Sequence, residues 1–139
     1  DIRTGEPLRR LVIPGVDSVK CFTAPVFFNG RIYFGSIERG LVCVDERTFE
    51  MLWTSPVEEA MLVTVEYHKP PLRQLASVPV IWKGLVWATC QDGAVYAWDP
   101  ITGERKKRIF TGAPYLASAT VAEDCLYVAD YTGRVRCFS

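Results

Sequence analysis

The stretch "YAWDPITGE" (96–104) decides the fold, because its second half recurs along the chain. The Asp-x-x-Thr-Gly-Glu pattern reads D-I-R-T-G-E at 1–6, D-E-R-T-F-E at 45–50 and D-P-I-T-G-E at 99–104. Successive copies therefore begin 44 and 54 residues apart. Repeats of about 40–50 residues are typical of β-propeller blades, solenoids and repeat arrays.

A 22-residue block precedes the second and third copies and closes the chain. It reads "APVFFNGRIYFGSIERGLVCVD" (24–45), "VPVIWKGLVWATCQDGAVYAWD" (78–99) and "SATVAEDCLYVADYTGRVRCFS" (118–139), with no gap in the alignment. Each block holds three apolar segments separated by short turns, and its Val, Ile, Tyr, Phe and Trp residues favour half-buried strands. We expect a fourth strand after each Asp turn, at 9–13, 51–54 and 108–111.

Four antiparallel strands per repeat predict an all-β chain of about three propeller blades. The predicted units of this single domain, 1–139, are approximately 1–44, 45–98 and 99–139. The middle unit carries an insertion at about 56–76, which includes a stretch with helical leanings, 56–64, and the pair Pro70-Pro71. Paired prolines disfavour regular structure, so we expect the insertion to form a loop on one rim.

Three blades do not close a ring, since propellers have about four to eight blades. An open arc exposes strand edges and the flank of each end blade. The chain therefore predicts either a segment of a longer propeller or a subunit whose ring is completed by other copies, with two copies giving six blades.

Composition and charge exclude several classes of function. Sixteen Lys and Arg residues balance sixteen Asp and Glu residues, and nonspecific binding of nucleic acid or anionic membranes needs a positive field. No apolar run approaches the roughly 20 residues of a membrane span. The start at Asp1 shows no signal peptide, so we expect a processed product or an excised domain, with no nucleic-acid partner and no membrane span.

The cysteines favour reduced, buried structural thiols. The chain has five, and no two form a C-x-x-C pair. Four lie in apolar, strand-like runs, where a free Cys behaves as a small hydrophobic residue. With one His in the chain, the sequence predicts neither a zinc site nor another metal site. The five residues are Cys21, Cys43, Cys90, Cys125 and Cys137.

The repeat resembles the pyrroloquinoline-quinone-type (PQQ-like) β-propeller repeat, whose signature is Asp-x-x-Thr-Gly followed by Trp. It resembles the WD-type repeat less well, because the Gly-His pair of that family is missing and this chain contains a single Trp-Asp dipeptide, Trp98-Asp99. The matching positions are Asp1, Thr4, Gly5, Asp45, Thr48, Trp53, Asp99, Thr102, Gly103 and the strand-entry prolines Pro25 and Pro79.

Departures from the family pattern predict less regular docking between blades. The resemblance implies that a Trp of each unit packs on the neighbouring blade, but only Trp53 is present. Arg9 and Lys107 hold the corresponding places, and Phe49 replaces the turn glycine of the second copy. We interpret the Asp turn itself as a corner between blades, in which the Asp side chain accepts backbone N–H bonds.

Residues that carry chemistry are sparse. The single His68 lies in the insertion without a nucleophile beside it in sequence, and the basic run 105–108 fits a charged edge strand. Quinone-binding relatives carry an adjacent Cys-Cys pair and amide ligands for calcium. This chain has no such pair, and its single Asn is Asn29 in a hairpin turn. The sequence therefore predicts no catalytic residue and no cofactor.

The favoured function is a noncatalytic propeller scaffold that binds a protein partner or other propeller blades, in the manner that the resemblance implies for assembly factors and sensor domains. Two alternatives stay open: an arc of a larger enzyme, either quinoprotein-like or attached to a hydrolase, and a carbohydrate- or small-ligand-binding propeller that uses Trp82, Trp87 and Trp98. The candidate interaction surface is the insertion, with Met61, Leu62, Tyr67, His68 and Leu72.

Overall fold

The fold is built from strands alone. A computed structural model describes residues 1–11, 23–62 and 71–139, and this part of the chain holds no helix, hence none that could cross a membrane. The strands are β1 (Val26–Phe28), β2 (Arg31–Ser36), β3 (Gly40–Asp45), β4 (Met51–Ser55), β5 (Val80–Trp82), β6 (Leu85–Thr89), β7 (Ala94–Trp98), β8 (Arg105–Phe110), β9 (Thr120–Ala122), β10 (Cys125–Ala129) and β11 (Val135–Phe138).

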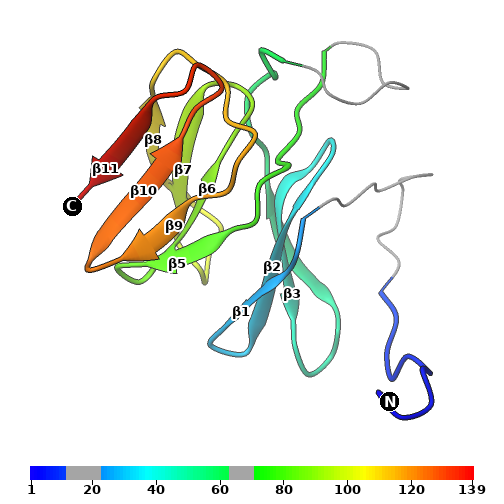
Figure 1. The fold of residues 1–139 in the computed structure, drawn as a ribbon. Helices are drawn as coiled ribbons and strands as arrows, with labels where there is room; N and C mark the ends of the chain where they lie inside the picture. The colour runs from blue at the N-terminus through cyan, green and yellow to red at the C-terminus, as the bar shows by residue number, and fades with distance from the viewer. Residues whose placement is uncertain (12–22, 63–70) are drawn as a thin grey trace.

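The strands form three antiparallel sheets, each a meander. The first has the order β1-β2-β3-β4, the second β5-β6-β7-β8, and the third β9-β10-β11. The second sheet lies between the other two, because one apolar cluster joins it to the first sheet and another joins it to the third. Figure 1 shows the three sheets arranged as consecutive blades. The predicted all-β fold of a partial propeller is confirmed.

The second and third Asp turns each lie inside a sheet. Asp45 stands between β3 and β4, where its carboxylate accepts the backbone N–H groups of Arg47 and Thr48, each at 2.8 Å. Asp99 does the same between β7 and β8. The interpretation of the turn as a corner between blades is therefore wrong. The sheets extend over 26–55, 80–110 and 120–138, so units counted from the Asp cut each blade between its third and fourth strands.

Two layers of the core lie between the sheets, and a smaller cluster surrounds Val42 and Val44 of the first sheet. Alternate strand residues face opposite sides, so the middle sheet contributes to both layers. The layer between the first and second sheets contains Tyr33, Leu41, Cys43, Val86, Ala88, Tyr96 and Trp98. The layer between the second and third sheets contains Trp82, Trp87, Val95, Ala97, Tyr115, Leu126 and Val128.

The described ends of the insertion pack into the molecule. Val57 and Leu75 belong to the layer between the first two sheets, and Gln74 pairs with Ile37 through an isolated β-bridge. A Cβ built on Gly35 would lie 2.1 Å from the carbonyl oxygen of Leu75, so the segment crosses directly over β2. The ends of the insertion therefore form part of the core. The helical leaning expected for 56–64 is absent from its described part, 56–62.

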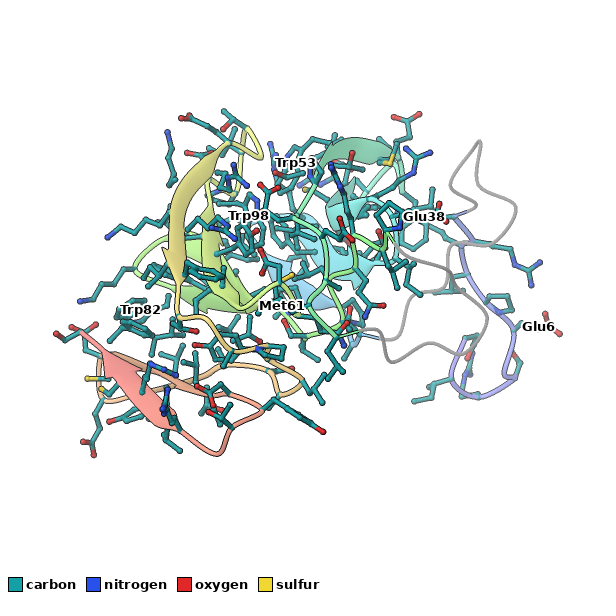
Figure 2. The ribbon with its side chains drawn as sticks, turned by 90° about the horizontal axis from the view of Figure 1, so that it is seen from above. Glu6, Glu38, Trp53, Met61, Trp82 and Trp98 are labelled. Atoms are coloured by element: carbon teal, nitrogen blue, oxygen red, sulfur yellow. The ribbon has the colours of Figure 1, made fainter. Side chains whose placement is uncertain are left out.

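Trp53 makes the blade-to-blade contact that the family resemblance implies. Its indole packs on Gly103 in the Asp turn of the second sheet, and a Cβ built on Gly103 would lie 2.6 Å from the ring. Gly103 has φ +72°, a conformation that costs residues with a Cβ roughly 1–2 kcal/mol. Figure 2 shows Trp53 on the first sheet where it approaches the second. Glycine is thus required here by both backbone and packing.

Two departures from the family pattern, Arg9 in the first copy and Phe49 in the second, compensate each other. Arg9, at the place of the Trp, donates hydrogen bonds to the carbonyl oxygens of Glu46, at 2.8 Å, and of Arg47. Phe49 occupies the glycine position with φ +62° and packs among the apolar residues of β3 and β4. Trp53 packs its indole directly on the turn at Gly103. Arg9 instead hydrogen-bonds to the carbonyls of its turn, which leaves room for the Phe49 side chain. Docking is therefore retained with different chemistry.

Candidate interaction site at the rim

The candidate site lies where the β6–β7 turn, the insertion and the end of β8 meet. A buried polar network forms its base, and exposed apolar side chains form its surface. We call the exposed part the rim patch; it comprises the exposed Met61, Phe110 and Tyr131 and the half-buried Pro114, which lie around the buried Gly93.

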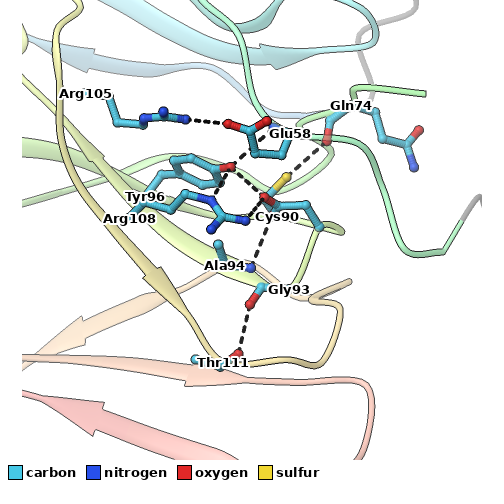
Figure 3. A network of polar contacts seen from close by, with 10 residues as sticks. Glu58, Gln74, Cys90, Gly93, Ala94, Tyr96, Arg105, Arg108 and Thr111 are labelled. Atoms are coloured by element: carbon cyan, nitrogen blue, oxygen red, sulfur yellow. Dashed lines mark hydrogen bonds and ion pairs between the residues drawn. The ribbon is translucent and has the colours of Figure 1, made fainter. Parts of the chain in front are cut away.

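Asp92 is the centre of the buried network; Figure 3 shows its partners Ala94, Tyr96 and Arg108. Its carboxylate accepts hydrogen bonds from the Tyr96 hydroxyl at 2.5 Å, from Nη2 of Arg108 at 3.1 Å and from the backbone N–H of Ala94 at 3.0 Å. The Asp92 side chain is 1% exposed. A buried carboxylate is stabilised only when it is paired and hydrogen-bonded. These three donors therefore fix the β6–β7 turn against β8.

Tyr96 connects this network to the insertion. Its hydroxyl also accepts hydrogen bonds from Nε of Arg108 at 3.1 Å and from the backbone N–H of Glu58 at 3.3 Å. Burial, followed by the hydrogen bond to Asp92, raises the pKa of Tyr96 to about 12, so the hydroxyl stays protonated and donates to the carboxylate. Arg105 pairs with the Glu58 carboxylate at 3.0 Å. The insertion is thereby fixed to the second sheet at 58.

The basic run 105–108 is largely neutralised within the chain. It forms most of β8, the outer strand of the second sheet, which confirms the predicted edge strand. Arg105 and Arg108 pair with acidic residues of the network, and Lys106 pairs with Glu104 at 2.5 Å. The run therefore presents little unpaired positive charge for a polyanion.

The rim patch is apolar and exposed. Met61 is 56% exposed and Phe110 is 58% exposed, yet both are held in place. A Cβ built on Gly93 would lie 2.9 Å from the Met61 sulfur and 3.2 Å from the Phe110 ring. The Met61 N–H also bonds to the Gln91 carbonyl at 2.9 Å. Figure 2 shows Met61 at the junction of the first two sheets.

The patch continues onto the third sheet. The backbone N–H of Ala113 would lie 3.3 Å from a Cβ on Gly93, and the neighbouring Pro114 accepts a hydrogen bond from the N–H of Tyr131 at 2.8 Å. The Tyr131 side chain is 64% exposed. Exposed Met and aromatic side chains on a fixed backbone have the composition of interface cores.

The structure places the residues of the surface predicted from the sequence in different environments. Met61 is exposed and Leu62 is half-buried, while Tyr67 and His68 lie outside the described residues. Leu72 was predicted to be available for contact, but it is 4% exposed, because the segment that carries it packs beneath the rim. The prediction is wrong for this residue. Phe110 and Tyr131 were missed; they stand in a strand end and a turn, and no sequence pattern distinguishes them there.

The indoles proposed for ligand binding are core residues. Trp82, Trp87 and Trp98 are all buried between sheets. Trp98 stacks on Tyr96 at 5.2 Å between ring centroids. None of the three presents a face to solvent for a sugar ring, so a ligand site on these residues does not form.

The buried thiols are unsuited to nucleophilic chemistry. Burial raises the pKa of Cys43 to about 11 and raises that of Cys90 further, whereas nucleophilic thiols have lowered pKa values. The Cys90 thiol donates instead to the Gln74 carbonyl at 3.4 Å. Within the ranges that the structure describes, no three His, Cys, Asp or Glu side chains gather as a metal site. The expectation that the cysteines are buried is wrong for Cys137, which is exposed, and for Cys125, which is half-buried; Cys21 lies outside the described residues.

A second acidic turn lies in the third sheet. The Asp130 carboxylate accepts hydrogen bonds from Oγ1 of Thr132 at 2.6 Å, from the N–H of Thr132 at 2.9 Å and from the Arg136 guanidinium. The bond from the Thr132 hydroxyl, followed by that from Arg136, holds the pKa of Asp130 well below its usual range. The ionised carboxylate therefore stabilises the β10–β11 turn.

This arrangement predicts a contribution to acid sensitivity. Because the pKa of Asp130 is lower in the folded chain, the unfolded chain binds more protons as the pH falls through about 4. Stability from Asp130 is therefore fully present above that pH and is lost progressively as the pH falls from there toward the lower pKa of the folded chain. We expect Asp130→Asn to be less stable than the wild type at pH 7, with a flatter decline between pH 5 and 3, as measured by urea unfolding. An unchanged slope would show that the carboxylate contributes nothing.

Comparisons with known proteins support the fold. No protein-family model matches the chain, and no curated protein matches it. The structure is similar to that of BamB from Moraxella catarrhalis, with a TM-score of 0.64 and 19% sequence identity over 94% of this chain and 38% of that one. The chain thus spans little more than a third of BamB. The designed protein Ika4 also matches, at 12% identity over 94% of this chain and 97% of its own, with a TM-score of 0.44. The designed protein Ika8 matches at 12% identity over 85% of this chain and 45% of its own, with a TM-score of 0.41.

Proposed function

We propose that this partial propeller is a noncatalytic scaffold of the PQQ-like repeat type, which binds a protein partner through the rim patch. The observation that carries the proposal is an exposed Met-aromatic surface supported by a rigid, buried polar network. Side chains that are already held in place lose less conformational entropy on binding. Met61 and Phe110, both held against Gly93, therefore suit the centre of an interface.

Charge at the edge of the patch indicates the chemistry of the partner. The Arg108 guanidinium lies 5.2 Å from the centre of the Phe110 ring and is about a third exposed, while its partner Asp92 is buried. Because Asp92 already neutralises Arg108, a partner segment that combines an apolar side chain with an uncharged hydrogen-bond acceptor would contact both Phe110 and Arg108. An apolar contact surrounded by polar groups is the usual anatomy of a protein interface.

A pull-down with matched variants tests this function. The immobilised chain is incubated with an extract of the source cells, and bound proteins are quantified by mass spectrometry. Proteins that bind through the patch should be retained by the wild type and lost at least about 10-fold with Met61→Glu/Phe110→Glu, since interface anchors contribute 2 kcal/mol or more. Equal retention by both would overturn the proposal.

The control substitutes an exposed apolar residue outside the patch. Ile101, in the β7–β8 turn, is 66% exposed, so Ile101→Glu adds a charge without touching the patch. The control should retain every protein that the wild type retains. Loss with the control as well would mean that binding is nonspecific adsorption to apolar surface.

A further inference from the structure

One face of the third sheet exposes positions that are buried in the other two sheets. The tenth position of the 22-residue block is Tyr33 in the first sheet and Trp87 in the second, and both are buried. In the third sheet it is Tyr127, which is exposed. In the first two sheets this face is covered by the next blade.

Two other positions of the block behave in the same way. At the eighteenth, Leu41 and Val95 are buried whereas Val135 is 71% exposed. At the twentieth, Cys43 and Ala97 are buried whereas Cys137 is exposed. Tyr127, Val135 and Cys137 therefore form an open docking face, equivalent to the faces that already carry a blade. The outer strand β11 has no further strand beside it in the part of the chain that the structure describes.

The N-terminal segment has the complementary features. Gly5 N–H bonds to the Asp1 carbonyl at 2.9 Å and Arg3 N–H to Oδ1 of Asp1 at 2.9 Å. Gly103 and Ile101 make the same bonds to Asp99, at 3.0 and 2.8 Å. Residues 1–6 thus adopt the same turn that joins the third and fourth strands in the second sheet. Residues 7–11 follow the Asp1 turn just as β4 follows the Asp45 turn and β8 follows the Asp99 turn. However, residues 7–11 pair with no described strand.

We propose that the open face and edge of the third sheet bind the N-terminal segment of a second copy of this chain, in a head-to-tail contact. Residues 7–11 of that copy would add to β11 as its fourth strand. Arg9 would keep its hydrogen bonds to the Asp45 turn of its own copy. In the same way, Trp53 of the first sheet contacts Gly103 in the Asp99 turn of the second sheet. The contact continues the two blade interfaces that the chain already contains.

The repeat also gives the register of this strand pair. In the first sheet Cys43 pairs with Trp53, and in the second Ala97 pairs with Lys107; each partner stands eight residues after the turn Asp. The corresponding pair is Cys137 with Arg9 of the second copy. Residues directly opposite each other have Cα atoms about 4.5–5.5 Å apart, within the range of a disulfide.

Charge does not oppose this register. The same alignment places Arg10 of the second copy opposite Arg136, since Thr54 and Arg108 pair with the matching residues of β3 and β7. Arg136 is already paired with the buried carboxylate of Asp130, so its charge is neutralised before the second copy binds.

Disulfide trapping tests the register. In an Arg9→Cys/Cys125→Ser variant, the thiol introduced at position 9 of one copy should form a disulfide with Cys137 of another copy. Diamide is the oxidant and accepts the two thiol hydrogens. Cys125 is removed because it lies beside Cys137. We expect dimers and higher species on non-reducing gels, with a linked peptide pair containing positions 9 and 137. Leu8→Cys in the same background should cross-link at least about 5-fold less, because neighbouring strand residues face opposite sides.

Sedimentation of the unmodified chain gives an independent measurement. The average mass of the wild type should rise above 15.7 kDa with concentration. Val135→Glu should restore the monomer, while Ile101→Glu should associate like the wild type. A wild type that stays monomeric up to roughly 100 µM, or equal cross-linking at positions 8 and 9, would overturn the proposal. Rim-patch binding is measured separately, so either proposal can fail alone.

Discussion

Gly103→Ala is expected to lower the free energy of unfolding by about 3 kcal/mol, and Gly5→Ala by only about 1 kcal/mol. Both glycines occupy the same place in an Asp turn, with φ +72° and +78°. Each substitution therefore carries a similar backbone cost. They differ in space: a Cβ at Gly103 would lie 2.6 Å from the Trp53 ring, whereas a Cβ at Gly5 has nothing within 4 Å.

Urea unfolding of the two variants beside the wild type measures this difference. The excess cost of Gly103→Ala should disappear in a Trp53→Ala background, where about 1 kcal/mol remains. If the excess persists without the indole, the clash with Trp53 is not its cause. Equal losses for Gly5→Ala and Gly103→Ala would show that the backbone conformation alone requires glycine.

The repeat predicted the fold because its signals are local. Turn residues at fixed offsets and alternating apolar residues specify hairpins within a few positions. The 22-residue block therefore located the first three strands of every sheet. The Asp turn was misplaced because an Asx turn has the same residues whether it joins strands of one blade or two.

Features that depend on tertiary contact were beyond the sequence. Leu72 stands in a proline-containing segment that resembles an exposed loop, yet the segment crosses β2 where Gly35 has no side chain. Phe110 gave no signal because its exposure depends on the position of the Gly93 turn. In the sequence, Phe49 is a departure from the glycine of the motif. In the structure, it is accommodated because Arg9 hydrogen-bonds to the turn carbonyls where the second unit has Trp53. In each case a second segment, remote in sequence, determines the environment.

The buried network is expected to be the second strongest determinant of stability. Asp92→Ala should lower the free energy of unfolding by about 3 kcal/mol, because it leaves the buried Tyr96 hydroxyl without its carboxylate partner and removes the ion pair of the partly exposed Arg108. Asp92→Asn keeps the shape and one acceptor but removes the charge, so a loss of about 2 kcal/mol is expected.

The matched control is Asp124→Asn. Asp124 pairs with Lys83 at 3.5 Å, but its side chain is 80% exposed, and exposed ion pairs contribute about 0–1 kcal/mol. Asn also tolerates the positive φ at this position. Urea unfolding should therefore separate the two Asn variants by more than 1 kcal/mol, and similar losses would contradict a buried pair. Since the same carboxylate positions Arg108 beneath Phe110, Asp92→Asn should also weaken partner retention by the rim patch, whereas Asp124→Asn should leave it unchanged.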